Sequence, residues 1–475
     1  MRDSGAGSTA TFERRNPVTG AVASTARAMT PAEAVAVADA AAAAFPGWAA
    51  LGPQARRALL LKAADALAAR GDAFRDAMMA ETGATAAWAG FNVMLAAGMI
   101  REAAALTTQV AGEVIPSDRP GCLAMAIREP AGVCLGIAPW NAPVILGVRA
   151  IATALACGNT AVLKASEVCP RTHALVVESF AEAGLAQGVV GLVTNAPADA
   201  ADVVGTLIDH PAVRRVNFTG STHVGKVIAR RCAEHLKPVL LELGGKAPLV
   251  VLDDADLDEA VKAAAFGAFF NSGQICMSTE RIIVVDGIAD AFVARLRDKA
   301  ATLFAGDPAR GEAPLGALVD RKGVDWVASL VEDAVSKGGE ALAGGAPADG
   351  VLMPATVIDK VTADMKLYRH ESFGPVVAVI RARDEAHAIE LANDSDYGLS
   401  AAVFTRDTAR GLRVARAIKS GICHVNGPTV HDEAQMPFGG TKGSGYGRFG
   451  GKAGIAEFTE LRWITVETQP GHYPI

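Results

Sequence analysis

After residue 132 the sequence alternates between short runs rich in β-branched residues and segments of helix length, and this alternation is the strongest constraint on the fold. The runs of the first block predict strands at 133–138, 160–164, 189–194, 213–218 and 239–243. The segments between them predict helices at 143–156, 171–183, 197–209 and 223–236. Crossovers of about a dozen residues join parallel strands, so this block predicts a parallel sheet with helices on both faces. Such sheets bind ligands at the carboxyl ends of their strands.

A second block with the same alternation follows and indicates a second α/β unit. Its expected strands are 249–252, 281–286, 376–380, 401–405 and 422–425, and its expected helices are 256–270, 289–303, 324–337, 385–392 and 408–418. The glycine-rich patch 438–445 is too flexible to be a regular element. A chain of 475 residues is long enough for two or three domains.

The segments outside the two blocks have a different pattern. Residues 31–44, 55–69, 73–81 and 91–110 predict helices, and Trp88 falls in the connection before the last of them. Residues 123–129 and 461–466 each predict a lone strand. A lone strand needs a partner, so we expect the terminal strand to pair with 123–129 or with another subunit.

Composition and charge exclude several classes of protein. The formal net charge is −6, and the sequence contains no long run of basic residues. Both observations argue against a nucleic-acid partner. Residues 1–8 lack the apolar core of a signal peptide, and no apolar run is long enough to cross a bilayer, so we expect a cytoplasmic protein without membrane contact. The 7 cysteines form no C-x-x-C pair and the 9 histidines show no H-E-x-x-H spacing, which indicates reduced thiols and no metal site.

Cys276 stands between a helix-like run and a strand-like run, directly after the polar and flexible residues 271–274. A thiol held in a loop by rigid neighbours is well placed to act as a nucleophile. A free cysteine is also among the most frequently buried residue types, so Cys276 could equally be a small core residue. This stretch alone leaves both interpretations open.

The turn 218–225 lies between a predicted strand and a predicted helix and contains Gly220 and Ser221. Glycine lets the backbone approach a ligand closely, and a helix N-terminus offers free N–H groups and partial positive charge to a phosphate. The turn lacks the G-x-G-x-x-G spacing of dinucleotide-binding proteins. An ordinary strand-to-helix turn capped by Ser221 is therefore the alternative to a cofactor site.

Lys164 ends another predicted strand, and Ser166 and Glu167 follow it. The ammonium group could bind a ribose hydroxyl or a phosphate, and the carboxylate could accept hydrogen bonds from a ribose diol. A carboxylate there would repel a 2′-phosphate, which favours NAD over NADP. An ordinary surface pair of Lys164 and Glu167 is the alternative.

Glu242 and Asn141 are polar residues next to apolar strands. Glu242 lies inside 239–243, where a carboxylate must be paired or become neutral, and a carboxyl group with a raised pKa in a cleft suits a general base. The alternative is a buried glutamate bonded to backbone N–H groups. Asn141 stands at an expected helix N-cap, where its amide could either stabilise an oxyanion or only cap the helix.

Together these residues resemble the NAD(P)-dependent aldehyde dehydrogenase superfamily, whose motifs recur here in order and at the same spacing over nearly the whole chain. The motifs are Pro139-Trp140-Asn141, Lys164-Ala165-Ser166-Glu167, Phe218-Thr219-Gly220-Ser221, Leu241-Glu242-Leu243-Gly244-Gly245-Lys246, Gly273-Gln274-Ile275-Cys276, Glu371-Ser372-Phe373-Gly374-Pro375 and Pro437-Phe438-Gly439-Gly440. The resemblance implies an α/β fold with a Rossmann-like cofactor domain, a second α/β catalytic domain and a small β oligomerisation arm. It assigns 1–116 and 138–247 to the NAD-binding domain, 248–436 to the catalytic domain, and 117–137 and 455–475 to the arm.

The resemblance also implies a role for each matched residue. Cys276 would be the nucleophile and Glu242 the general base, while the side-chain amide of Asn141 and the backbone N–H of Cys276 would form an oxyanion hole. Glu242 is a hydrolytic base that the CoA-acylating relatives lack, so the expected product is a free carboxylic acid. NAD is the expected cofactor, with NADP less favoured. Its expected contacts are Ile137, Pro139, Trp140, Lys164, Ser166, Glu167, Gly220, Ser221, Leu243, Glu371 and Phe373.

Within the superfamily, 431–440 and 445–450 resemble the bacterial aromatic-aldehyde branch, which includes salicylaldehyde, vanillin and benzaldehyde dehydrogenases. The expected substrate is therefore an aromatic aldehyde, with Trp88, Arg149 and Met277 in its pocket. Arg149 could bind a ring hydroxyl or a carboxylate, or it could form a buried salt bridge to another helix. The alternatives are a semialdehyde dehydrogenase for carboxylated aliphatic substrates and a non-catalytic binding protein on the same scaffold. The resemblance implies a homodimer or a dimer of dimers.

Overall fold

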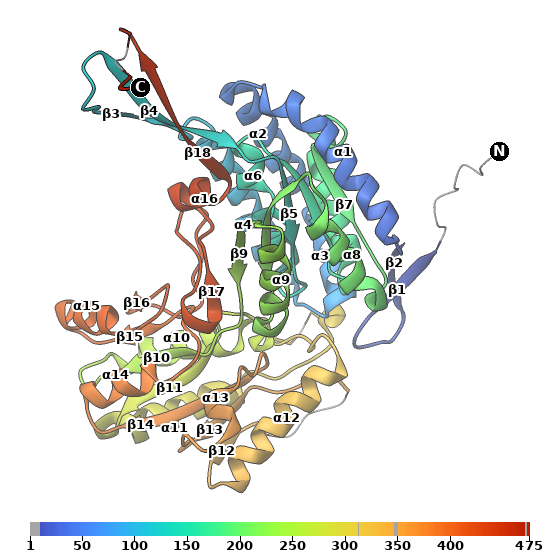
Figure 1. Cartoon of the computed structure of the whole chain (residues 1–475). Helices are drawn as coiled ribbons and strands as arrows, with labels where there is room; N and C mark the ends of the chain where they lie inside the picture. The colour runs from blue at the N-terminus through green and yellow to red at the C-terminus, as the bar shows by residue number, and fades with distance from the viewer. Residues whose placement is uncertain (1–9, 312, 346–349, 471–472) are drawn as a thin grey trace.

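The structure is a computed structural model that describes residues 10–311, 313–345, 350–470 and 473–475. The expectation that residues 1–8 lack a signal core lies outside this range. Two large sheets, each flanked by helices, form the body of the molecule, and a small antiparallel sheet projects from it (Figure 1). Among the described residues, no helix is long and apolar enough to cross a membrane.

The first large sheet contains the strands expected in the first block. Its order is β17 (Gly445–Tyr446), β9 (Val239–Glu242), β8 (Val213–Thr219), β5 (Val133–Ile137), β6 (Thr160–Lys164) and β7 (Val190–Val193). All neighbours are parallel except β17, which runs antiparallel to β9. The connecting helices are α5 (Pro143–Arg149), α6 (Ala152–Ala156), α7 (Pro170–Glu182), α8 (Ala200–Asp209) and α9 (Thr222–Glu234). Every residue of β5 and β6 is buried, which explains their nearly unbroken apolar sequence.

The second large sheet contains the strands of the second block. Its order is β12 (Glu340–Ala343), β13 (Thr356–Asp359), β14 (Val376–Ala382), β11 (Thr279–Val285), β10 (Ala247–Val251), β15 (Ala402–Phe404) and β16 (His424–Val425). β12 is antiparallel to β13, and the other pairs are parallel. The helices are α10 (Leu257–Phe269), α11 (Asp286–Ala301), α12 (Arg321–Ser336), α13 (Lys366–Arg369), α14 (Glu385–Asn393) and α15 (Thr408–Ala417). The sequence pattern does not predict β12 and β13, because both strands are short and carry weak alternation.

The N-terminal region contains the expected helices and an unexpected hairpin. The hairpin is β1 (Thr11–Arg15) and β2 (Val22–Arg27), and the helices are α1 (Pro31–Ala49), α2 (Pro53–Ala69), α3 (Gly71–Thr82) and α4 (Ala86–Leu106). The position expected for Trp88 was wrong, because α4 begins before it. The hydroxyl of Thr85 accepts a hydrogen bond from the backbone N–H of Trp88 at 3.3 Å and so caps the helix at Thr85.

The single helix expected at 143–156 is two helices, α5 and α6, with a break at Ala150 and Ile151. The side-chain amide of Asn217 on β8 donates to the carbonyl of Ala150 at 3.0 Å, so this carbonyl is bonded to the neighbouring strand. Gly136 on β5 lies so close to Ala150 that an added Cβ would be 2.7 Å from its methyl group. The break therefore follows from close packing of the helix on the sheet, which periodicity does not reveal.

The glycine-rich patch is more regular than expected. It contains a short 3-10 helix, η4 (Lys442–Ser444), followed by β17. The other 3-10 helices are η1 (Pro197–Asp199), η2 (Phe270–Gly273) and η3 (Pro308–Arg310). The hydroxyl of Ser444 donates to the carbonyl of Gly244 at 2.6 Å, and it accepts from the N–H of Gly398 at 3.0 Å. These tertiary bonds hold a segment that glycine content alone marks as flexible.

The small antiparallel sheet contains β18 (Thr459–Glu467), β4 (Cys122–Pro130) and β3 (Glu113–Ile115). The expected pairing of the terminal strand with 123–129 is confirmed. Figure 1 shows this sheet extending away from the body, and the short helix α16 (Gly451–Glu457) leads into β18. The range 117–137 expected for the arm also contains β5, which lies in the six-stranded sheet.

Candidate active site

Cys276 lies in a turn between η2 and β11, at the helix-to-strand junction that the sequence predicts. The approach to it has an unusual backbone, because Asn271 and Ser272 have φ values of 49° and 54°. Non-glycine residues in this left-handed region are strained and persist only where the surroundings hold them. The Gln274 side chain provides part of that hold. Its Nε2 donates to Ala317 at 3.1 Å, and its Oε1 accepts from the N–H of Val319 at 2.9 Å.

Asn141 follows β5 and points at the loop that carries the thiol. Its Nδ2 donates to the carbonyl of Gln274 at 3.0 Å. The expectation that Asn141 stands at the helix N-cap was wrong, because the N-cap of α5 is Ala142 and no side chain caps it. An amide nitrogen carries two N–H groups, so one remains for a ligand near Cys276. The backbone N–H of Cys276 likewise has no hydrogen-bond partner within the described chain.

Trp88 holds the backbone of Asn141 in place through a hydrogen bond. Its Nε1 donates to the Asn141 carbonyl at 2.8 Å, and the Nδ2 of Asn271 donates to the same carbonyl at 3.1 Å. The indole is 2% exposed and meets the Phe270 ring edge-on at 4.9 Å between centroids. Trp88 is therefore part of the support beneath Asn141 as well as a candidate aromatic wall for a substrate.

Glu242 ends β9 with its carboxyl group fully enclosed. The residue is 1% exposed, and neither carboxylate oxygen has a hydrogen-bond partner within the described residues. This rules out the alternative of a glutamate bonded to backbone N–H groups. Burial raises the pKa of Glu242 to about 7, while Arg149 and the nearby Cys276 thiol oppose the rise. A buried carboxyl group with free acceptor oxygens and this pKa can take up and release protons near neutral pH.

Cys276 is a protonated thiol in this arrangement. Burial, Glu242 and Glu371 raise its pKa well above the ordinary range, and the positive charge of Arg149 acts in the opposite direction. A thiol becomes a good nucleophile only as the thiolate, so Cys276 needs a base. Glu242 is close enough to raise the pKa of Cys276 and is the group that can accept its proton.

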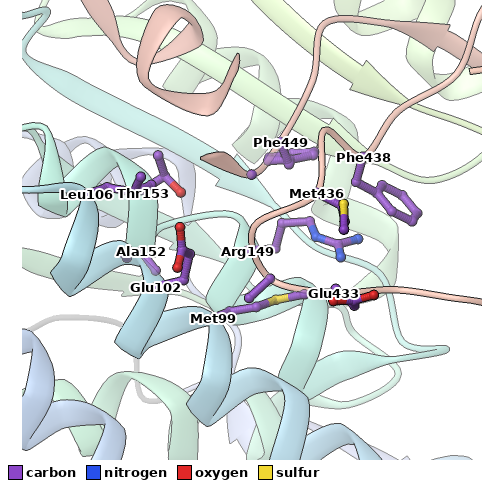
Figure 2. A pocket seen from close by; sticks show the side chains of 13 residues that line it. Met99, Glu102, Leu106, Arg149, Ala152, Thr153, Glu433, Met436, Phe438 and Phe449 are labelled. Atoms are coloured by element: carbon purple, nitrogen blue, oxygen red, sulfur yellow. The ribbon is translucent and has the colours of Figure 1, made fainter. Parts of the chain in front are cut away.

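Arg149 forms a buried ion pair, as one of the two sequence interpretations expects. Its partner is Asp432 in the segment after β16, not a helix residue, and the two side chains are 6% and 8% exposed. The guanidinium lies 4.1 Å from the centre of the Phe438 ring and 5.9 Å from that of Phe449. Figure 2 shows the Arg149 side chain extending toward the segment that carries Met436 and Phe438. The pocket beside it has a volume of about 20 Å³, which is room for a water molecule.

A larger cleft, with a volume of about 580 Å³, opens at the carboxyl ends of β5, β6 and β8. Seven of the expected cofactor contacts line it, namely Ile137, Pro139, Trp140, Lys164, Ser166, Glu167 and Gly220. Lys164 and Glu167 form an ion pair at its edge, and Asn195 donates to Glu167 Oε1 at 2.9 Å. A mainly apolar cleft of this volume with a few polar lining groups fits a dinucleotide, so the residues present suit the expected NAD.

The other expected cofactor residues lie around this cleft without lining it. Ser221 caps α9, and its hydroxyl accepts from the N–H of Val224 at 3.4 Å. Leu243 packs on α9, and Glu371 accepts a hydrogen bond from the N–H of Gly245 at 2.8 Å. Phe373 meets the Trp140 ring edge-on at 5.7 Å between centroids. Burial raises the pKa of Glu371 to about 8.

Part of the cleft wall and the partner of Arg149 are not predicted by the sequence pattern. The wall consists of apolar residues of α8 and α9, among them Val204, Ile208, Val224 and Val227. Val224 and Val227 belong to an apolar helical pattern, yet they are 42% and 50% exposed. Exposed apolar side chains of this kind indicate a binding face, but their exposure is known only from the structure. Asp432 lies in the segment 431–440, but the residues next to it in the sequence do not indicate that it pairs with Arg149. Met277, the remaining expected substrate residue, is 5% exposed, directly after Cys276.

No group of three or more metal-ligating side chains comes together in the part of the chain that the structure describes.

A sequence profile described as the aldehyde dehydrogenase family matches residues 5–464. The vanillin dehydrogenase of Pseudomonas fluorescens is 62% identical over 465 residues, which cover 98% of this chain and 96% of that protein. A salicylaldehyde dehydrogenase of Pseudomonas putida is 50% identical with the same coverage. The crystal structure of a salicylaldehyde dehydrogenase from Pseudomonas putida G7 complexed with salicylaldehyde superposes with a TM-score of 0.96 at 49% identity, covering 98% of this chain and 96% of that one.

Proposed function

This chain belongs to the aldehyde dehydrogenase family, and we propose that it oxidises an aromatic aldehyde to the free carboxylic acid with NAD as the cofactor. The observation that carries the proposal is the buried Glu242 carboxyl group, whose oxygens are unpartnered within the described residues and which lies beside the Cys276 thiol. A nucleophile and a base thus lie side by side, and an amide donor is bonded to the loop that carries the nucleophile. This constellation argues against the alternative of a non-catalytic binding protein.

The residues divide the reaction between them. Glu242 accepts the proton of the Cys276 thiol, and the sulfur attacks the aldehyde carbon. The side-chain amide of Asn141 and the backbone N–H of Cys276 hold the resulting oxyanion, an effect typically of about 3–4 kcal/mol per donor. When bound, the nicotinamide of NAD supplies the acceptor for the hydride of the tetrahedral carbon.

The second half of the reaction releases the product. The carbon bound to Cys276 is now a thioester. Glu242, after passing its first proton to solvent, takes a proton from a water molecule that attacks this thioester. The carbon–sulfur bond breaks, the carboxylic acid leaves and the thiol is restored. A pKa near 7 allows Glu242 to serve in both halves at neutral pH.

The proposal of an aromatic substrate rests on the surroundings of Arg149 and on the relatives. Arg149 is already paired with Asp432, so it offers no free cation to a substrate carboxylate. This pairing argues against the semialdehyde alternative. Trp88, Phe270 and Phe438 supply aromatic surface in the core around Cys276. The named relatives act on vanillin and salicylaldehyde, which are aromatic aldehydes.

NAD is favoured over NADP because of the charges at the edge of the cleft. Glu167 lines the cleft and is paired with Lys164, and a 2′-phosphate bound beside this carboxylate would meet its negative charge. Arg231 also lines the cleft, but Asp209 binds its guanidinium with two hydrogen bonds of 2.8 and 2.6 Å. The cation is therefore already neutralised.

The proposed assembly is an oligomer built through the projecting sheet. Val114 on β3 is 75% exposed, and Trp463 and Leu461 on β18 are 75% and 62% exposed, which is unusual for large apolar side chains on the two outer strands of one sheet. Static light scattering would give the mass in solution. A monomer mass would contradict this assembly.

A substrate panel tests the proposed function. The purified protein is assayed for NADH formation with benzaldehyde, butanal and succinic semialdehyde, and the acids formed are identified. We expect kcat/KM for benzaldehyde to exceed that for either aliphatic aldehyde by about 10-fold or more, because an aromatic ring fills an apolar pocket better. A higher value for succinic semialdehyde would instead support the semialdehyde alternative.

A further inference from the structure

Asp432 has a buried carboxylate oxygen without a partner. Its Oδ2 binds Arg149, while its Oδ1 is inaccessible to solvent and makes no hydrogen bond within the described residues. A buried acceptor left without a donor costs about 1–3 kcal/mol, so such an atom normally faces a donor from a ligand or a water molecule. The proposed reaction of Cys276 and Glu242 does not use this oxygen.

The segment that carries Asp432 is joined to the loop of the nucleophile. The hydroxyl of Thr429 donates to the carbonyl of Met277 at 2.7 Å, and Met277 directly follows Cys276. Val430 and Phe438, on either side of Asp432, belong to the same apolar cluster as Met277, and Cys276 packs against that cluster. The Asp432 segment is therefore fixed, through Thr429, to the residue that follows the thiol.

Arg149, the other member of the ion pair, lies on the helix that follows Asn141. It ends α5, which begins two residues after Asn141, and helical side chains lean toward the helix N-terminus. Arg149 lowers the pKa of both Glu242 and Cys276, whereas Asp432 acts on Glu242 in the opposite direction. The ion pair is thus within electrostatic reach of the two reacting groups.

We propose that Oδ1 of Asp432, held in place by Arg149, accepts a hydrogen bond from a hydroxyl group on the ring of the substrate. This inference rests on the proposed function, because it requires an aromatic aldehyde at Cys276. Asp432 then selects ring-hydroxylated aldehydes over unsubstituted ones. Arg149 is a positioning residue, since its guanidinium binds Oδ2 of Asp432 and turns that oxygen away from the substrate.

The alternative is that Arg149 itself receives the oxygen of an ionised phenol. The structure argues against this, because Arg149 already faces Asp432 and the rings of Phe438 and Phe449. A phenolate would also add a second negative charge beside Asp432, and like charges in a buried site repel strongly. A neutral hydroxyl donor is the group that matches the free oxygen.

The first experiment compares benzaldehyde with its three monohydroxy isomers and their methoxy counterparts. We expect kcat/KM of one hydroxy isomer to exceed that of benzaldehyde by about 10-fold or more, in the range of a hydrogen bond to a charged group. The matching methoxy compound lacks the donor and should show no such gain. If benzaldehyde itself is not oxidised, the proposed function fails. If benzaldehyde is oxidised and no hydroxy isomer is preferred, only this inference fails.

The second experiment asks whether Asp432 causes the preference. In the variants D432N and R149M/D432L, the ratio of kcat/KM for the preferred hydroxy isomer to that for benzaldehyde should fall by about 10-fold. The double variant replaces the buried ion pair with apolar residues of similar size, which proteins commonly tolerate, so it remains informative if D432N folds poorly. Because the ratio compares two substrates on one protein, a general loss of activity cancels.

E433Q is the matched control. Glu433 loses the same charge one residue away, but its side chain is 43% exposed and bonds His431. The ratio should stay at the wild-type value in E433Q. A ratio that survives in both Asp432 variants, or that falls equally in E433Q, overturns the assignment.

The pH dependence of the same ratio separates Asp432 from Arg149 as the ring contact. The charged or titratable groups acting on Asp432 are Arg149 on α5, Glu242 on β9 and the adjacent His431. Charge on these groups acts on both substrates, so it cancels in the ratio. The ratio should fall as the phenol of the substrate loses its proton, because the donor is lost. A ratio that rises with ionisation of the phenol would show binding to Arg149 and overturn the proposal.

Discussion

The indole Nε1 of Trp88 donates a 2.8 Å hydrogen bond to the backbone carbonyl of Asn141, 53 residues further along the chain. This bond joins the first turn of α4 to the connection between β5 and α5. The backbone of Asn141 is fixed by it, while the side chain remains directed at the loop of Cys276. The position of a proposed oxyanion donor therefore depends on a residue that never needs to touch the oxyanion.

Substituting Trp88 with phenylalanine tests this support. W88F keeps an aromatic ring and removes the N–H donor, so we expect kcat/KM for benzaldehyde to fall by about 5- to 10-fold. The loss should appear mainly in kcat, because the oxyanion forms after the substrate binds. The dissociation constant of NAD, measured by fluorescence quenching, is the control and should not change. An equal loss in NAD affinity would indicate general disruption instead.

Substituting Cys276 with alanine tests the nucleophile. No thioester can form in C276A, so NADH production should fall to background for every aldehyde. NAD binding and the melting temperature should remain close to those of the wild type, since the thiol is a small group at the edge of the core. We expect the rate to fall by about 100-fold or more. A smaller loss would refute the assignment of Cys276 as the nucleophile.

Substituting Glu242 with glutamine tests the base in both halves of the reaction. E242Q keeps the shape of the side chain but accepts no proton from the thiol or from water, so thioester formation should slow and the enzyme should stop at the thioester. Stopped-flow measurements should show at most one equivalent of NADH per site, followed by steady turnover about 100- to 10,000-fold slower than in the wild type. Steady turnover at the wild-type rate would rule out Glu242 as the base.

The pKa of Glu242 predicts the pH profile. Glu242 acts as a base only when ionised, and burial raises its pKa to about 7. Activity should therefore be low below that pH and rise as the pH passes through about 7, reaching a plateau above it. In E242Q the residual NADH burst should lack this ionisation. Retention of the same rise in E242Q would assign the titration to another group.

Substituting Glu167 with glutamine tests the cofactor preference. The change removes the negative charge that opposes a 2′-phosphate while leaving a polar side chain beside Lys164. We expect the ratio of kcat/KM for NAD to that for NADP to fall by about 10-fold. D199N is a surface control in η1, and its ratio should equal that of the wild type. An unchanged ratio in E167Q would indicate that other groups discriminate between the cofactors.

Several elements could be predicted from the sequence because each depends on local pattern. The β-branched runs and helix-length segments predict the alternation of strands and helices, and this alternation predicts the two mainly parallel sheets. The junction before Cys276 is visible because polar, flexible residues separate a helix from a strand. The motif resemblance identified Glu242 and Asn141 as partners of the thiol, although neither is near it in the chain.

Other features depend on contacts that no local pattern records. The break between α5 and α6 arises from a bond between Asn217 and the Ala150 carbonyl. The glycine-rich segment is ordered by Ser444 through its bonds to Gly244 and Gly398. Sequence periodicity reports which face of an element is apolar, but it does not report which distant atom lies against it.

The sequence by itself determined the fold class and the family, because these are encoded in periodicity and in short motifs. Only the tertiary structure decided between the two interpretations of Arg149, by placing Asp432 beside it from 283 residues away. It also left one oxygen of Asp432 and both oxygens of Glu242 buried and unpartnered within the described chain. Whether a buried polar atom is satisfied depends on the full set of its neighbours in space, and that set exists only once the chain has folded.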